Sequence, residues 1–76
     1  MNAKQLRDRI DSLISHILFD YNGKPCGIDP LSRTEIDIWY GDEGATLSSV
    51  DEVMSAPFFD GKSLSDIVGD LQNIEE

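Results

Sequence analysis

The stretch EIDIWY, residues 35–40, alternates more regularly than any other part of this 76-residue chain. Apolar side chains recur at every second position, at Ile36, Ile38 and Tyr40, while Trp39 shares the opposite side with two acidic residues. A period of two is the signature of a strand that is buried on one face only. The stretch therefore predicts the central strand of a sheet whose apolar face needs a cover.

The segment before this strand predicts a β-hairpin. Asn22 and Gly23 both tolerate positive φ, and together they favour a two-residue turn between strands at residues 17–21 and 24–28. The turn sets the register, with these expected pairs: Ile17 with Ile28, Phe19 with Cys26, and Tyr21 with Lys24. Directly opposed residues share a face, so the apolar side chains of both strands fall on one side.

Helical patterns flank the predicted sheet on both sides along the chain. Apolar residues recur at helical spacing from residue 3 to about residue 16, where His16 closes the pattern. Ser49 is a good cap for a short helix over residues 50–55. Ser63 begins a last helix, whose apolar spacing continues as far as Ile74.

These elements predict an α+β fold. An N-terminal helix packs on a three-stranded antiparallel sheet, with residues 45–47 as a candidate fourth strand, and two short C-terminal helices follow. The length and the absence of a linker-like tract predict one small domain over residues 1–76. Between the last two helices, two adjacent aromatic residues, Phe58 and Phe59, are expected to plug the core.

The charge of the chain is strongly negative and uneven. Fifteen acidic and six basic residues give a formal net charge of −9, and eleven of the acids lie within residues 35–76. Such a field repels nucleic acid and anionic membranes, and it favours basic proteins or cations as neighbours. Many cytoplasmic proteins are acidic for solubility alone, so charge by itself assigns no function.

No catalytic or metal-binding pattern stands out. His16 and Cys26 are the only histidine and cysteine, which is too few for a zinc site or an obvious nucleophile and base. The acids do not follow the spacing of a calcium loop. Gly61-Lys62-Ser63 lacks the upstream glycine of a phosphate-binding loop. We therefore expect no enzyme activity, no catalytic residue, no metal and no cofactor.

The single cysteine also bears on the compartment. It excludes an intramolecular disulfide framework and indicates a reducing environment such as the cytoplasm. The N-terminal residues lack the apolar segment of a signal peptide, and the longest aliphatic or aromatic run covers only residues 17–19. We expect neither a signal peptide nor a membrane span.

Trp39 is the residue that most favours a binding function. It shares the polar side of the central strand with Asp37, and Asp42 and Glu43 follow in the next turn. A tryptophan among acids is typical of an interface anchor with a polar rim, so we expect these four residues to form an interaction surface. The alternative is that helix 50–55 or the C-terminal helix covers Trp39, because large aromatic side chains are highly buried on average.

Three functions follow in order of preference. The first is a non-enzymatic protein-interaction module of the cytoplasm, whose partner is another protein, a basic one in one version, or a second copy of the chain. The second is an acidic mimic of nucleic acid that inhibits or regulates a nucleic-acid-binding protein. It requires four further acids to form one negative face with the candidate surface: Asp51, Glu52, Asp66 and Asp70. The third is a small enzyme, which requires a pocket with perturbed carboxylates.

Four stretches of the chain carry a resemblance. They read YNGKPCGIDP at 21–30, IWYG at 38–41, SVDEVM at 49–54 and PFFDGKSL at 57–64. Together they resemble a group of small uncharacterised acidic proteins, without a known activity, from Gram-positive bacteria and their mobile elements. The resemblance implies a cytoplasmic bacterial protein and carries over no functional residue.

Overall fold

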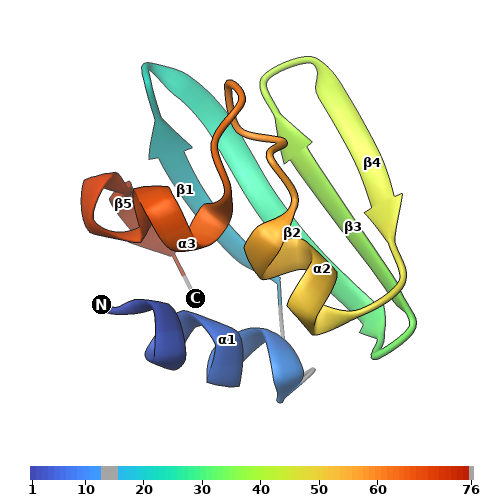
Figure 1. The fold of residues 1–76 in the computed structure, drawn as a ribbon. Helices are drawn as coiled ribbons and strands as arrows, with labels where there is room; N and C mark the ends of the chain where they lie inside the picture. Colours follow the sequence, from blue (N-terminus) through green and yellow to red (C-terminus); the bar gives the residue numbers. More distant parts are fainter. Residues whose placement is uncertain (13–15, 76) are drawn as a thin grey trace.

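The computed structural model describes residues 1–12 and 16–75, and Figure 1 shows the α+β arrangement of this part of the chain. The elements follow in this order: α1 (Ala3–Asp11), β1 (Ile17–Tyr21), β2 (Lys24–Ser32), β3 (Glu35–Tyr40), β4 (Glu43–Leu47), α2 (Val50–Ser55), α3 (Leu64–Ile67), the 3-10 turn η1 (Val68–Asp70) and β5 (Gln72–Glu75). The predicted helix, antiparallel sheet and two short C-terminal helices are confirmed.

The sheet is antiparallel throughout, with the strand order β4-β3-β2-β1-β5. The hairpin of β1 and β2 has the predicted register, with Phe19 opposite Cys26. Its turn residues Asn22 and Gly23 have φ values of 56° and 76°, the positive values that this kind of turn requires. The candidate strand at residues 45–47 is confirmed as the C-terminal part of β4.

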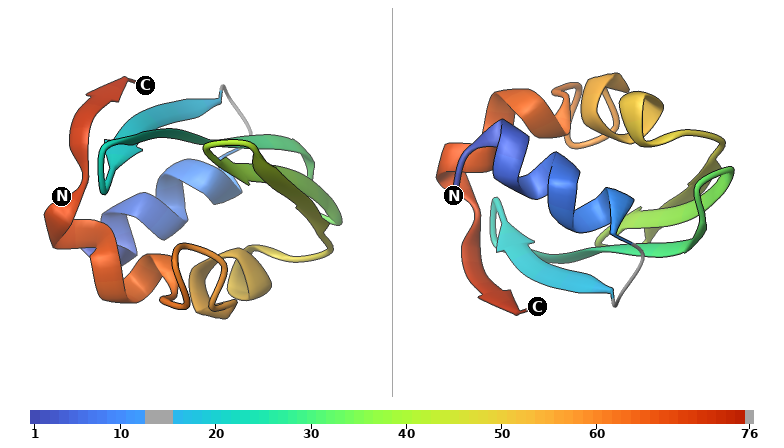
Figure 2. Two further views of the ribbon diagram at one scale, coloured as in Figure 1. Left: turned by 90° about the horizontal axis from the view of Figure 1, so that it is seen from above. Right: turned by 90° about the horizontal axis from the view of Figure 1, so that it is seen from below.

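The helices all lie on one face of the sheet, and both views of Figure 2 show this two-layer arrangement. The core fills the space between the layers. Its buried residues come from α1, α2 and α3, from the three central strands and, in the case of Phe59, from the loop between α2 and α3: Leu6, Ile10, Ile17, Phe19, Cys26, Ile28, Ile36, Ile38, Tyr40, Val50, Val53, Met54, Phe59, Leu64 and Ile67. The alternation of EIDIWY thus works as predicted, because Ile36, Ile38 and Tyr40 point into this core.

The prediction that the last helix continues to Ile74 is wrong. The helix begins as predicted, with the amide of Asp66 donating to the Ser63 hydroxyl, but it ends at Ile67. Gly69 costs about 1 kcal/mol relative to alanine inside a helix, which weakens continuation. Residues 72–75 instead pair with β1 as an edge strand, and Asn73 at φ 53° forms an irregularity there. The open edge of β1 offers backbone hydrogen bonds that an isolated helical turn cannot match.

The first helix is shorter than its sequence pattern. Asn2 and Gln5 form the reciprocal capping box at its start, but the helix ends at Asp11. The predicted helical positions Leu13 and Ile14 lie outside the described residues. His16 is exposed directly before β1 and does not close the helix as predicted.

Candidate interaction surface

The sheet has a second face, away from the helices, which no described helix covers. We call it the outer face (Figure 2). Strand alternation and the paired registers assign the following side chains to it: Leu18, Asp20, Pro25, Asp29, Glu35, Asp37, Trp39, Thr46 and Glu75. No lysine or arginine of the described strands alternates onto this face. It is therefore an acidic surface with a few apolar side chains.

Trp39 lies in a row of residues that crosses all five strands. The members of this row are Glu75 of β5, Leu18 of β1, Gly27 of β2, Trp39 of β3 and Gly44 of β4. The six-membered ring of the indole lies over Gly27, since a Cβ built on Gly27 would be 2.1 Å from Cζ2 of Trp39. Gly27 thus leaves the space that the indole occupies against β2, and we call this contact the seat of Trp39. Trp39 is partly buried by this contact and partly exposed.

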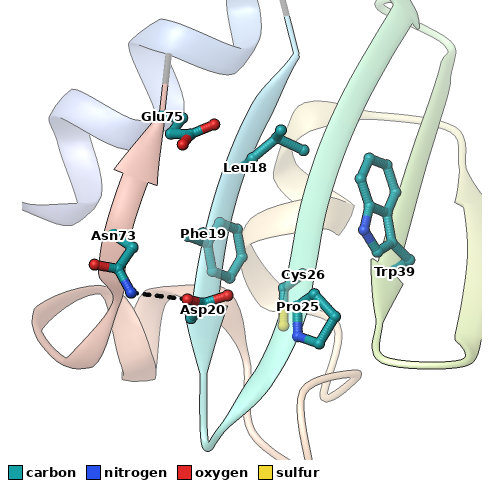
Figure 3. A pocket seen from close by; sticks show the side chains of 8 residues that line it. All are labelled: Leu18, Phe19, Asp20, Pro25, Cys26, Trp39, Asn73 and Glu75. Carbon is teal, nitrogen blue, oxygen red and sulfur yellow. Dashed lines mark hydrogen bonds between the residues drawn. The ribbon is translucent and has the colours of Figure 1, made fainter.

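An open hollow of about 240 Å³ lies beside Trp39 on the outer face. Figure 3 shows the side chains of the residues that line it, of which Phe19 and Cys26 have their side chains in the core: Leu18, Phe19, Asp20, Pro25, Cys26, Trp39, Asn73 and Glu75. Asn73 Nδ2 donates to Asp20 Oδ2 at 2.8 Å, which ties β5 to β1 at the rim. The hollow combines an aromatic and an aliphatic wall with carboxylates at two of its edges.

Two carboxylates oppose each other on the neighbouring row of this face. Asp29 of β2 is paired with Asp37 of β3, and directly opposed like charges destabilise a sheet. The hydroxyl of Thr46 donates to Asp37 Oδ1 at 2.7 Å, which satisfies one oxygen without supplying a positive charge. Among the described residues, the ion pairs involve acids other than Asp29 and Asp37, for example Asp11, which is paired with Arg33. A cation brought to this row would relieve the repulsion.

The four residues of the predicted surface are divided by the structure. Asp37 and Trp39 lie together on the outer face. Glu43 is paired with Tyr40, whose side chain points into the core. The side chain of Glu43 therefore leaves the sheet on the face that the helices cover, not on the outer face. Asp42 lies in the turn between β3 and β4 and is exposed.

Asp42 and Glu43 belong to a second hollow, of about 390 Å³, at the turn end of the hairpins. Lys24 also lines this hollow, and its Nζ lies 4.9 Å from the centre of the Tyr40 ring. The two acids therefore have a basic residue as a neighbour, unlike Asp37 and Asp29.

The alternative in which a helix covers Trp39 is wrong. Both α2 and α3 contribute buried residues to the core on the opposite side of the sheet, including Val53 and Leu64.

The position of these helices also bears on the hypothesis of a nucleic-acid mimic. Its additional acids lie on α2, on α3 or in η1: Asp51, Glu52, Asp66 and Asp70. They do not join the acids of the outer face in one negative face, and Asp51 is instead paired with Arg7 of α1.

Several residues of the outer face were not among the four residues of the predicted surface. The hairpin register already sets Leu18 opposite Gly27, so the sequence contained a signal for this pair. The contact of Gly27 with Trp39 depends on how β2 pairs with β3 across a longer connection. The place of Glu75 on this face could not be predicted, because the apolar spacing before it, which continues as far as Ile74, predicts a helix and not a strand.

Cys26 is buried at the centre of the sheet opposite Phe19, as predicted for a small apolar core residue. Its Sγ donates a weak hydrogen bond to the Lys24 carbonyl at 3.4 Å. Burial raises the pKa of the Cys26 thiol above its ordinary value of 9.0, although hydrogen bonds with the backbone of Tyr21 and Gly41 oppose the shift. The neutral thiol is therefore the favoured form in the folded protein.

This raised pKa predicts a loss of stability at alkaline pH. The contribution of the neutral thiol is fully present below the thiol pKa of the unfolded chain and is lost as the pH rises through the folded value. Urea unfolding of the wild type and of Cys26→Ala between about pH 7 and about pH 10 measures it. We expect the free energy of unfolding of the wild type to fall further than that of the variant. A constant difference between the two proteins across this range would contradict the prediction.

The described residues contain no group of three or more histidine, cysteine, aspartate or glutamate side chains placed to hold a metal ion. Within the same part of the chain, every helix is too short or too polar to cross a membrane. Comparisons of the chain with protein-family models, curated proteins and solved structures found no match. The resemblance to small acidic bacterial proteins stays a prediction.

Proposed function

We propose that the protein is a non-enzymatic interaction module that binds a basic segment of another protein on its outer face. One observation carries the proposal. Trp39 is partly exposed and seated on Gly27, in a sheet face that has carboxylates around it and no basic residue from the described strands. Partly buried aromatic anchors within a polar rim are typical of the centre of protein interfaces.

The seat on Gly27 supports the role of Trp39 as an anchor. Contact with the backbone of β2 restricts the indole before binding, so less conformational entropy is lost when a partner covers it. A tryptophan ring also attracts lysine and arginine side chains through its π-electrons. The same cation would approach Asp29 and Asp37, whose mutual repulsion it would relieve. An acidic aromatic surface therefore favours a basic partner over an acidic one.

We further propose that the protein acts in the cytoplasm. Cys26 is a free, buried thiol, and a reducing compartment keeps such a residue reduced.

Capture of partners with the tagged protein tests the proposed surface. We expect the wild type to hold a partner from a bacterial lysate at about 50 mM and about 200 mM salt. Trp39→Ala should weaken capture about ten-fold or more at both concentrations, because interface anchors of this type dominate binding energy. Asp37→Asn should weaken it less, since it removes one charge and leaves the indole in place.

Leu31→Ala provides the matched control. Leu31 is 56% exposed and lies near the C-terminal end of β2, away from Gly27. The change therefore also removes an apolar side chain from the surface of the sheet, but not beside Trp39. We expect this variant to capture the partner like the wild type. Equal losses with Leu31→Ala and Trp39→Ala would contradict the proposed site. A basic nucleic-acid-binding partner that is lost at the higher salt and insensitive to Trp39→Ala would favour the nucleic-acid mimic instead.

A further inference from the structure

The two edges of the sheet differ in how they are protected. β5 is short, pairs irregularly with β1 and contains Asn73 at positive φ, and such irregular edges resist the addition of another strand. β4 pairs with β3 over five consecutive residues without an irregularity. It contains neither proline nor lysine, and no described element lies beyond it (Figure 1). Apart from the charge of Glu43 at its first position, β4 thus lacks the devices that natural proteins use to block an edge.

The register shows which backbone groups of β4 face the open edge. The amide of Gly41 donates to the Pro25 carbonyl at 2.8 Å, which marks a hydrogen-bonded pair between β3 and β2. Such pairs recur at every second residue, so Trp39 also directs its peptide groups toward β2 and away from β4. Gly44, its partner in β4, therefore directs its own N–H and C=O outward, and so does Thr46. Both residues are exposed.

Gly44 also leaves a path from this edge to Trp39. It occupies the position next to Trp39 in the row that crosses the sheet. A Cβ built on Gly44 would have only the Ile38 carbonyl oxygen within 4 Å, at 3.7 Å, so the space above it is open. A long side chain from an added strand can cross Gly44 and reach the indole and Asp37.

We infer that β4 is a docking edge, where an extended basic segment of the partner adds to the five-stranded sheet as a further strand. The inference rests on the proposed function and names the form in which the partner binds. Side chains of the added strand that stand beside Gly44 and Thr46 point to the outer face, where lysine or arginine meets Asp37 and Trp39. The alternate side chains point the other way, beside the partly buried Ala45 and Leu47, and are apolar.

Charge selects this occupant over a second copy of the chain. Pairing of β4 with itself would bring together two chains that each carry a net charge of −9. Self-repulsion of this kind opposes association, whereas a basic segment is attracted.

A synthetic peptide tests the inference. The probe is a fluorescein-labelled peptide of about seven residues that alternates valine with lysine or arginine, long enough to span the five residues of β4. Its affinity is measured by fluorescence anisotropy. Thr46→Pro removes an outward N–H from the edge, a position where proline is tolerated in a sheet. We expect this change to weaken binding about ten-fold or more.

Thr46→Val is the matched control. Like Thr46→Pro, it removes the hydrogen bond from the Thr46 hydroxyl to Asp37, but it keeps the backbone N–H at position 46. We expect it to bind the peptide within about three-fold of the wild type. The same peptide with alternate backbone amides methylated, so that it cannot add as a strand, should also bind about ten-fold more weakly or worse. This second measurement decides the question if Thr46→Pro fails to fold.

The outcomes separate this inference from the proposed function. Equal binding of the peptide by Thr46→Pro and Thr46→Val, with full binding of the methylated peptide, overturns the docking edge. A loss with Trp39→Ala in that case still supports the outer face as the site. No binding of the peptide to the wild type overturns both. A wild-type dimer that Thr46→Pro dissociates overturns the basic segment as the occupant in favour of a second copy.

Discussion

Phe59→Ala is expected to remove a large share of the free energy of unfolding of this domain at 25 °C. The ring is fully buried and contacts three other aromatic rings, those of Phe19, Tyr40 and Phe58, at centroid distances of 5.9, 6.1 and 5.2 Å. Truncation of a buried phenylalanine costs about 3–5 kcal/mol. A domain of 76 residues has a free energy of unfolding of about 4–11 kcal/mol. Urea denaturation followed by circular dichroism measures the change.

The loop that carries Phe59 explains why this site cannot relax easily. Asp60 and Gly61 form a tight turn with φ values of 57° and 77°, and Phe59 is bridged to Lys62 across it. The turn therefore restrains the backbone, so that it cannot readily move to fill the cavity that loss of the Phe59 ring leaves. Phe58→Ala is the matched control, because Phe58 is the adjacent ring in the same loop but is only partly buried. An equal or larger loss of stability with Phe58→Ala would contradict the central role of Phe59.

Gly27→Val is expected to disturb both the stability and the binding surface. The new Cβ would fall 2.1 Å from Trp39 Cζ2, so the indole and the valine cannot occupy the observed positions together. Overpacking of this kind costs about 1–3 kcal/mol. Trp39 is the only tryptophan of the chain, so its fluorescence emission reports its environment directly. We expect a red shift, because the displaced indole becomes more exposed to water.

A double mutant separates this clash from other effects of the valine. In the Trp39→Ala background, Gly27→Val no longer meets the indole, so its cost in the free energy of unfolding should largely disappear. Valine also has a high preference for strands, and the change can then even stabilise the protein. An equal cost of Gly27→Val in both backgrounds would show that Gly27 is needed for a reason other than the seat of Trp39.

Much of the architecture followed from local patterns. Asn22 and Gly23 determined both the hairpin and its register, because a two-residue turn with positive φ leaves one way to pair the strands. The alternation at residues 35–40 identified β3 and its buried side. The three helix starts were readable from Asn2, Ser49 and Ser63, whose side chains each accept a backbone N–H as expected of a cap.

The candidate surface was only half predictable. Strand alternation was enough to place Asp37 and Trp39 on one side of β3. It was not enough to place Asp42 and Glu43, because the turn after Tyr40 brings the chain back with Glu43 on the core side. The contribution of Leu18, Gly27 and Glu75 needed the pairing of strands that are distant along the chain.

The sequence by itself determined the elements whose signals are local: the caps, the two-residue turn and the alternation of a half-buried strand. Tertiary structure alone decided the fate of residues 72–75, where helical spacing gave way to pairing with the free edge of β1. It also decided that Trp39 lies over Gly27 on the face opposite the helices. The physical reason is the same in both cases. Backbone hydrogen bonds and close contacts between distant segments outweigh local preferences of about 1 kcal/mol per residue or less.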